Sequence, residues 1–134
     1  MKRIIRINKN VIEALIDHAQ SEMPCEACGY LAAKNGTIIK QYPLTNLDRA
    51  NDHFSMDPQE QFTAIQDMRS RGLQLAAVYH SHPETPARPS QEDLRLAFDP
   101  QISYVIVSLA KPEATIKSFK IRQGNVTPED IEIV

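Results

Sequence analysis

The stretch "LQLAAVYHSH" at residues 73–82 constrains the fold more than any other part of the chain. It is short of charge and rich in small and apolar side chains, a pattern typical of a central strand buried on both faces. Strand and helix patterns alternate around it, which indicates an intermixed architecture rather than a helical bundle or a sandwich. We therefore predict an α/β fold in which residues 1–134 form a single domain, with a mixed β-sheet flanked by helices.

Short apolar runs mark the other strands. Asn35-Gly36 separates two of them and is the strongest short hairpin signal that a sequence offers. The segment "NLDRANDHFSM" at 46–56 is polar and predicts an irregular loop. Further strands are expected near residues 3–7, 28–34, 37–44, 102–110 and 115–121, and the tail at 124–134 can supply a last short one.

Two longer segments, at residues 8–24 and 57–71, carry the spacing of amphipathic helices. The first can be capped by Asn8 or Asn10, and the second by Asp57, with a proline in its first turn and a stop at Gly72. A third helix is expected to start at Ser90. The side chains predicted to face inward are Ile12, Leu15, Ile16 and Ala19 in the first helix and Phe62, Ile65 and Met68 in the second.

Composition and charge exclude several classes of function. The 134 residues carry a net charge of -2 with both signs interspersed, so we expect neither nucleic acid nor an anionic membrane as a partner. The apolar run at the start is too short for a signal peptide, and no stretch approaches the roughly 20 apolar residues of a membrane span. We expect a cytoplasmic protein whose two cysteines are reduced thiols or metal ligands. The sequence indicates nothing about oligomeric state.

The segment "YHSHPETPARPSQED" at 79–93 places two histidines at a spacing of two. On a strand, His80 and His82 point to the same face, where one metal ion can accept both. Prolines stiffen the loop that follows, and the next helix brings Asp93 within reach as a third ligand. Two imidazoles and a carboxylate suit Zn²⁺ and leave its fourth position for water, whose pKa the ion lowers to about 7. The pattern is that of a catalytic zinc site, but an H-x-H on a strand is by itself more often two polar side chains with ordinary hydrogen-bond partners, so the residues alone leave both interpretations open.

Ser90 belongs to the same constellation, H-x-H-x7-S-x2-D, but it also has a purely structural interpretation. Ser90 and Asp93 form a good capping box, in which the serine accepts a hydrogen bond from the third residue of the helix. A serine that caps a helix is then expected not to donate its hydroxyl freely elsewhere. From the residues alone, capping and catalysis compete at the same atoms.

The full pattern resembles a known family. An upstream glutamate followed by H-S-H-P-x6-S-x2-D looks like the JAMM (MPN+) zinc isopeptidases. The stretches "PCEACGYL", "FSMDPQEQF" and "YVIVSL" look like segments of the short bacterial members, so the resemblance covers nearly the whole chain. It implies the JAMM/MPN α/β fold, related to that of cytidine deaminases, with a mixed sheet between helices.

The resemblance also implies roles and partners. It makes His80, His82 and Asp93 the zinc ligands, Glu26 the general acid/base, and Ser90 the donor to the oxyanion. Family members cleave amides after the C-terminal glycine of ubiquitin or ubiquitin-like proteins, and the short bacterial members act beside sulfur carriers. We therefore expect a zinc-dependent amide hydrolase, acting on peptide or isopeptide bonds, whose partner is the Gly-Gly tail of a ubiquitin-like sulfur-carrier protein. The alternative within this class is a peptidase for small substrates or for an unrelated protein tail, and the sequence does not identify the carrier or the leaving group.

Cys25 and Cys28 support rival interpretations. With a P-C-x-x-C and an H-x-E they contain the two strings of a zinc deaminase, but in reversed order, and this leaves His80 and Asp93 without a role. With His80 and His82 they could instead close a structural zinc shell in a non-catalytic binding module. A thioredoxin-like pair is disfavoured because a helix, not a strand, precedes the cysteines. The family pattern uses Cys28 only as a small buried residue that starts a strand.

Overall fold

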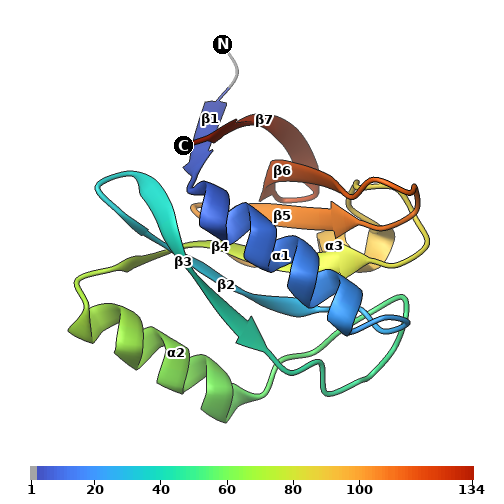
Figure 1. Cartoon of the computed structure of the whole chain (residues 1–134), viewed down its shortest axis with the longest axis horizontal. Helices are drawn as coiled ribbons and strands as arrows, with labels where there is room; N and C mark the ends of the chain where they lie inside the picture. Colours follow the sequence, from blue (N-terminus) through green and yellow to red (C-terminus); the bar gives the residue numbers. More distant parts are fainter. Residues whose placement is uncertain (1–2) are drawn as a thin grey trace.

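The computed structural model describes residues 3–134 and contains, within that range, seven strands and three helices (Figure 1). They follow in the order β1 (Arg3–Ile7), α1 (Lys9–Ser21), β2 (Cys28–Lys34), β3 (Thr37–Leu44), α2 (Pro58–Ser70), β4 (Gln74–His82), α3 (Gln91–Leu96), β5 (Ser103–Ser108), β6 (Thr115–Arg122) and β7 (Asn125–Ile133). Every strand expected from the sequence is present, and the tail forms a full strand, β7.

The sheet is mixed, as predicted, but it closes on itself. Its strand order is β1-β3-β2-β4-β5-β6-β7, and β1 pairs in parallel with both β3 and β7 to complete a barrel. Arg6 opposes Glu132 across this seam, and their side chains form an ion pair of 3.0 Å. The prediction of a sheet flanked by helices did not include this closure, because it depends on pairing between the two ends of the described chain.

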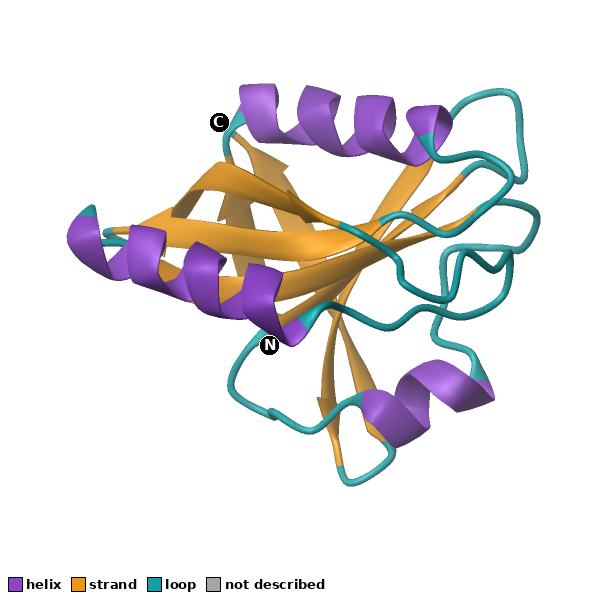
Figure 2. Cartoon of the chain, turned by 90° about the horizontal axis from the view of Figure 1, so that it is seen from below, coloured by secondary structure: helices purple, strands orange, loops and turns teal. Residues whose placement is uncertain are grey.

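Strand β4 lies inside the sheet, antiparallel to β2 and parallel to β5. Buried side chains of α1, among them Leu15, pack with Leu31 of β2 and with residues of β4 and β5. The neighbouring residues Tyr30 and Ala32 of β2 point the other way and pack with Met68 of α2. Figure 2 shows the three helices lying apart around the strands. The metal-site pattern at the end of β4 is therefore held by strands on both sides.

Both long helices begin where the sequence predicts. Asn8 rather than Asn10 caps α1, accepting a hydrogen bond of 2.9 Å from the backbone N–H of Asn10. Asp57 caps α2 in the same way. The inward face of α2 was predicted wrongly in one respect: Phe62 is 59% exposed. Phe62 lies about 200° around the helix from Ala64, which packs inward, so the helix cannot bury both.

None of the helices within residues 3–134 is long and apolar enough to cross a membrane.

Gly29 allows β2 to lie close to β3 and β4. A Cβ atom at this position would lie 2.4 Å from the carbonyl oxygen of Tyr42 and 2.5 Å from the ring of Tyr79. We expect Gly29→Ala to lower the free energy of unfolding by about 1–3 kcal/mol, because a methyl group must displace packed atoms. Denaturant titration measures this. Gly36→Asn is the control, because Gly36 has a φ of 83° with open space around it, and asparagine tolerates that conformation; equal losses in the two variants would contradict the packing argument.

Candidate active site

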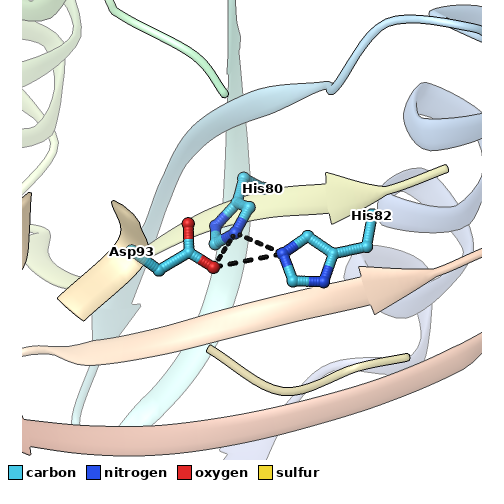
Figure 3. A group of neighbouring side chains, drawn as sticks. All are labelled: His80, His82 and Asp93. Carbon is cyan, nitrogen blue, oxygen red and sulfur yellow. Dashed lines mark hydrogen bonds and ion pairs between the residues drawn. The ribbon is translucent and has the colours of Figure 1, made fainter. Parts of the chain in front are cut away.

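The end of β4 and the start of α3 bring three predicted ligands together. Alternation along the strand places His80 and His82 on one face, and both side chains are buried. The following loop returns the chain so that Asp93, in the first turn of α3, faces them (Figure 3). The Nε2 atoms of the two histidines lie 3.1 Å apart, and Asp93 Oδ2 lies 3.0 Å and 3.1 Å from them. The predicted side chains therefore converge on one point.

The geometry of this cluster fits a bound metal ion. Ligand atoms that lie about 2.0–2.1 Å from a tetrahedral zinc ion are separated by about 3.3 Å, close to the distances found here. His82 Nδ1 donates to the carbonyl oxygen of Pro86 at 2.8 Å, so in the neutral form of the ring, which is the form that binds a metal, Nε2 presents its lone pair to the cluster. Lone pairs that converge in a buried place repel one another unless a cation lies between them.

Charge in the cluster is suited to a cation. Burial disfavours the ionised form of Asp93, but hydrogen bonds with His80 and His82 outweigh it and hold the pKa of Asp93 far below its usual range. Burial also opposes a charge on His82, but its hydrogen bonds to Asp93 and Pro86 raise the pKa of His82 above its usual value. Asp93 is therefore ionised at neutral pH, and a metal ion at the cluster competes with a proton on His82.

Ser90 caps α3, and the cap does not use up its hydroxyl group. Its Oγ accepts from the backbone N–H of Asp93 at 3.1 Å, while the backbone N–H of Ser90 donates to Asp93 Oδ2 at 2.9 Å. The capping bond takes a lone pair of the serine oxygen and leaves the hydroxyl proton free to donate. The expected competition between capping and catalysis is thus wrong: one serine can do both. The cap also fixes the orientation of the Asp93 carboxylate.

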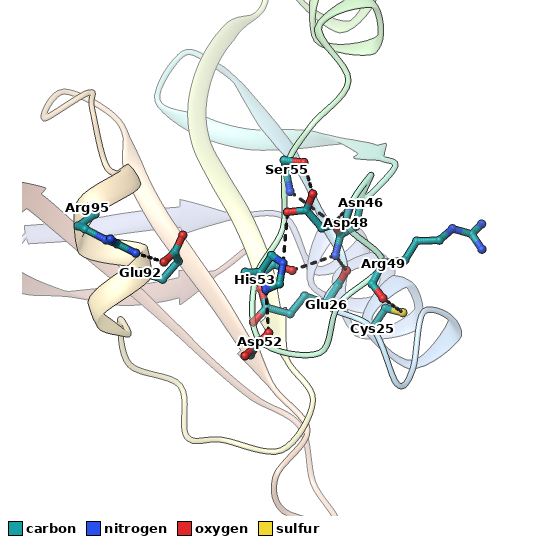
Figure 4. Close-up of polar contacts among 10 residues, drawn as sticks. All are labelled: Cys25, Glu26, Asn46, Asp48, Arg49, Asp52, His53, Ser55, Glu92 and Arg95. Carbon is teal, nitrogen blue, oxygen red and sulfur yellow. Dashed lines mark hydrogen bonds and ion pairs between the residues drawn. The ribbon is translucent and has the colours of Figure 1, made fainter.

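Glu26 lies in the segment before β2 and is only 3% exposed. Its Oε1 atom is buried and has no hydrogen-bond partner, which distinguishes it from every other buried side-chain nitrogen or oxygen in residues 3–134. Burial raises the pKa of Glu26 to about 8, although attraction to His82 partly offsets this. Its backbone N–H donates to the carbonyl of Ala50 in the loop at 46–56, which Figure 4 shows around it. An uncompensated buried carboxyl group is typical of an acid/base site.

The cysteines take no part in the cluster. Within residues 3–134, the group of side chains able to hold a metal consists of the two histidines and the aspartate. Cys28 begins β2 and is buried, as expected, and burial raises the pKa of its thiol to about 12. The Cys25 thiol donates to the carbonyl of Arg49 at 3.2 Å. The deaminase and structural-zinc interpretations both require thiolate ligands, so this arrangement favours neither.

An apolar cavity of about 400 Å³ lies beside the cluster. His80 and Asp93 line it together with Phe54, Phe98 and Tyr104. The ring of Phe54 also stacks on that of His80, with centroids 4.9 Å apart. These aromatic residues were not predicted from the sequence to be part of the site. The sequence signal for them is weak, because Phe54 lies in the polar segment at 46–56 and Phe98 lies in the loop after the short helix. In the structure the Phe98 side chain is 84% exposed, which is unusual for a large apolar residue.

The metal site can be tested by substitution. Asp93→Asn should lose most of its bound metal, because the amide replaces a charged ligand, while its oxygen can still accept from Ser90 and preserve the helix cap. The double variant Cys25→Ser, Cys28→Ser should keep its metal. Elemental mass spectrometry of proteins purified in parallel measures both. Metal loss in the double cysteine variant would contradict this ligand set.

Two named relatives are similar over most of this chain. The CysO-cysteine peptidase of Mycobacterium tuberculosis is 33% identical over 98% of this chain and 92% of its own length. The probable TtuB-protein conjugate cleaving protease of Thermus thermophilus is 30% identical over 70% of this chain and 64% of its own length.

Solved structures share the fold. A protein from Desulfitobacterium hafniense is 46% identical and superposes with a TM-score of 0.87, covering 98% of this chain and 92% of that one. A JAB1/MPN domain protein from Archaeoglobus fulgidus superposes with a TM-score of 0.65 at 20% identity, over 96% of this chain and 97% of that one, which supports the predicted MPN fold. The model of a protein family described as prokaryotic homologs of the JAB domain matches residues 8–122. The chain therefore belongs to this JAB family, as the sequence predicted, and is a hydrolase.

Proposed function

We propose that this chain is a zinc-dependent peptidase that cleaves the amide bond after the C-terminal Gly-Gly of a ubiquitin-like sulfur-carrier protein. The observation that carries the proposal is the convergence of His80, His82 and Asp93 near a buried glutamate whose carboxyl group lacks a partner. The names of the relatives, a peptidase for CysO-cysteine and a protease for TtuB conjugates, support a conjugate of this kind as substrate.

The cluster would hold zinc through the two histidine Nε2 atoms and Asp93 Oδ2. Bound there, zinc supplies a Lewis acid that lowers the pKa of water and polarises the carbonyl group of the substrate. Glu26 takes the proton from the attacking water and delivers it to the departing amine. Its raised pKa suits a group that must hold that proton between the two steps. Ser90 donates a hydrogen bond from its free hydroxyl group to the oxygen that becomes negative.

The cavity beside the cluster offers a place for the carrier tail. Its lining is mainly apolar, and its wall includes Phe54 and Phe98. A flexible tail that ends in two glycines can enter a narrow site, while apolar residues before them bury surface against these rings. Exclusion of water by the tail strengthens the electrostatic interactions in the site.

Mass spectrometry of defined conjugates tests the substrate. Carrier proteins whose Gly-Gly tail is joined to a free amino acid or to a lysine side chain should each be incubated with the zinc-loaded protein. We expect release of the carrier with an intact Gly-Gly terminus from at least one of them. A carrier tail with a changed final glycine is the control. Failure to cleave any Gly-Gly conjugate would contradict the proposed substrate.

Glu26→Gln should abolish hydrolysis and leave zinc in place. The amide has the shape of the carboxyl group but cannot accept the proton of water at neutral pH. Conjugate cleavage and zinc content, measured on the same preparation, check both parts. An active Glu26→Gln variant would contradict the acid/base role, and loss of zinc would show a structural one.

Ser90→Ala should lower kcat by about 10²–10³-fold, the size typical of one lost oxyanion donor. It should also cost about 1 kcal/mol of stability through the lost helix cap. Ser90→Thr keeps both the cap and the hydroxyl group and is the matched control. Kinetics well below the melting temperature separate the two effects, since a loss of stability at unchanged kcat would leave capping as the only role.

A further inference from the structure

The peptide group that joins Glu26 to Ala27 is held on both sides by side chains without an assigned role. Its carbonyl oxygen accepts a hydrogen bond of 3.0 Å from Asn46 Nδ2. Its N–H donates a hydrogen bond of 2.7 Å to Ser81 Oγ. Asn46 is 4% exposed and Ser81 1% exposed, so water cannot replace either contact. This one peptide group is therefore fixed by two buried polar side chains.

Ser81 connects the glutamate segment to the metal-site strand. It lies between His80 and His82, and strand alternation directs its side chain to the opposite face. Its backbone N–H also donates to the carbonyl of Ala27 at 2.9 Å, so Ser81 bonds both polar backbone groups of that residue. The strand that carries the two histidines thus sets the position of the residue next to Glu26.

Asn46 connects the same peptide group to the loop at 46–56. Besides the Glu26 carbonyl, Asn46 Nδ2 reaches the carbonyl of His53 at 3.2 Å. Its Oδ1 accepts from the backbone N–H groups of Asp48 at 3.0 Å and Ser55 at 3.4 Å. Figure 4 shows the loop gathered around this amide and Glu26. The buried Asn46 side chain therefore holds the loop at 46–56 in shape and links it by a hydrogen bond to the backbone of Glu26.

We propose that Asn46 and Ser81 are positioning residues that hold Glu26 in place relative to the metal-site strand. Glu26 needs such support because its own Oε1 atom makes no hydrogen bond that would orient the carboxyl group. A displacement of about 1 Å in a reacting group is enough to lower a rate 10²-fold. The inference rests on the proposed function, since it concerns the placement of the proposed acid/base.

Four variants test the two contacts separately. Ser81→Ala removes the acceptor of the Ala27 N–H, and Ser81→Thr restores it. Asn46→Asp keeps an oxygen for the loop N–H groups but replaces the donor to the carbonyls of Glu26 and His53 by a second acceptor. Asp48→Ala is the loop control: it removes the 2.8 Å bond from Ser55 Oγ to Asp48 and the 3.6 Å contact of Asp48 with His53, both within the loop, and removes no contact of the Glu26–Ala27 peptide group.

We expect Ser81→Ala and Asn46→Asp to lower kcat by about 10- to 100-fold, with KM within about twofold of the unchanged protein and with zinc retained. Ser81→Thr and Asp48→Ala should stay close to the unchanged protein. Hydrogen exchange followed by NMR gives a readout without substrate: the Ala27 amide should exchange faster in Ser81→Ala, while amides in the middle of β5 keep their protection.

The outcomes separate the two proposals. Unchanged kcat in both Ser81→Ala and Asn46→Asp, in a preparation whose parent cleaves conjugates, would overturn the positioning inference alone. Equal losses in Asp48→Ala would also overturn it, because the effect would then belong to the loop as a whole. A parent protein that cleaves no conjugate would overturn the proposed function, and the inference with it.

Discussion

The rest of the structure depends on the close approach of three ligand atoms, Nε2 of His80, Nε2 of His82 and Oδ2 of Asp93. A cluster of this kind is stable only with a cation or a proton at its centre, and only if each ligand is oriented from outside. The pairing of β4 with β2 and β5 fixes both histidines. The carbonyl of Pro86 selects the tautomer of His82, and the capping box of α3 aims Asp93. Helix capping and loop geometry are thus part of the site itself.

The pKa values of two buried carboxyl groups near this point are shifted in opposite directions. Asp93 has partners on several sides, which keep it ionised, whereas Glu26 has an unpaired oxygen and a pKa raised to about 8. Environments that separate the pKa values of neighbouring carboxyl groups are how one site obtains both a permanent anion and a proton carrier. Both side chains are buried, so the difference arises from the hydrogen bonds that Asp93 receives and from the charges around each carboxyl group.

Local rules account for what the sequence predicted correctly. The two-residue period of a strand and the chemistry of a helix cap act over a few positions, so the meeting of His80, His82 and Asp93 could be foreseen, although their catalytic roles stay predictions. Burial of Phe62 could not be decided, because helical periodicity does not say which of two apolar sides faces the sheet. The cavity wall and the contacts of Ser81 and Asn46 join segments far apart in the chain, where spacing carries no information.

The seam between β1 and β7 has a consequence for the order of folding. During synthesis β1 leaves the ribosome long before its partner β7, so the seam between them cannot form until the rest of the sheet has been synthesised. Until then one side of β1 presents unpaired backbone groups to other chains. Charged residues on such an edge discourage mispairing, and Arg3 and Arg6 are placed there. In the closed barrel Arg6 forms an ion pair with Glu132, its register partner on β7. The same arginine that discourages mispairing of the free β1 edge therefore also favours the correct register between β1 and β7.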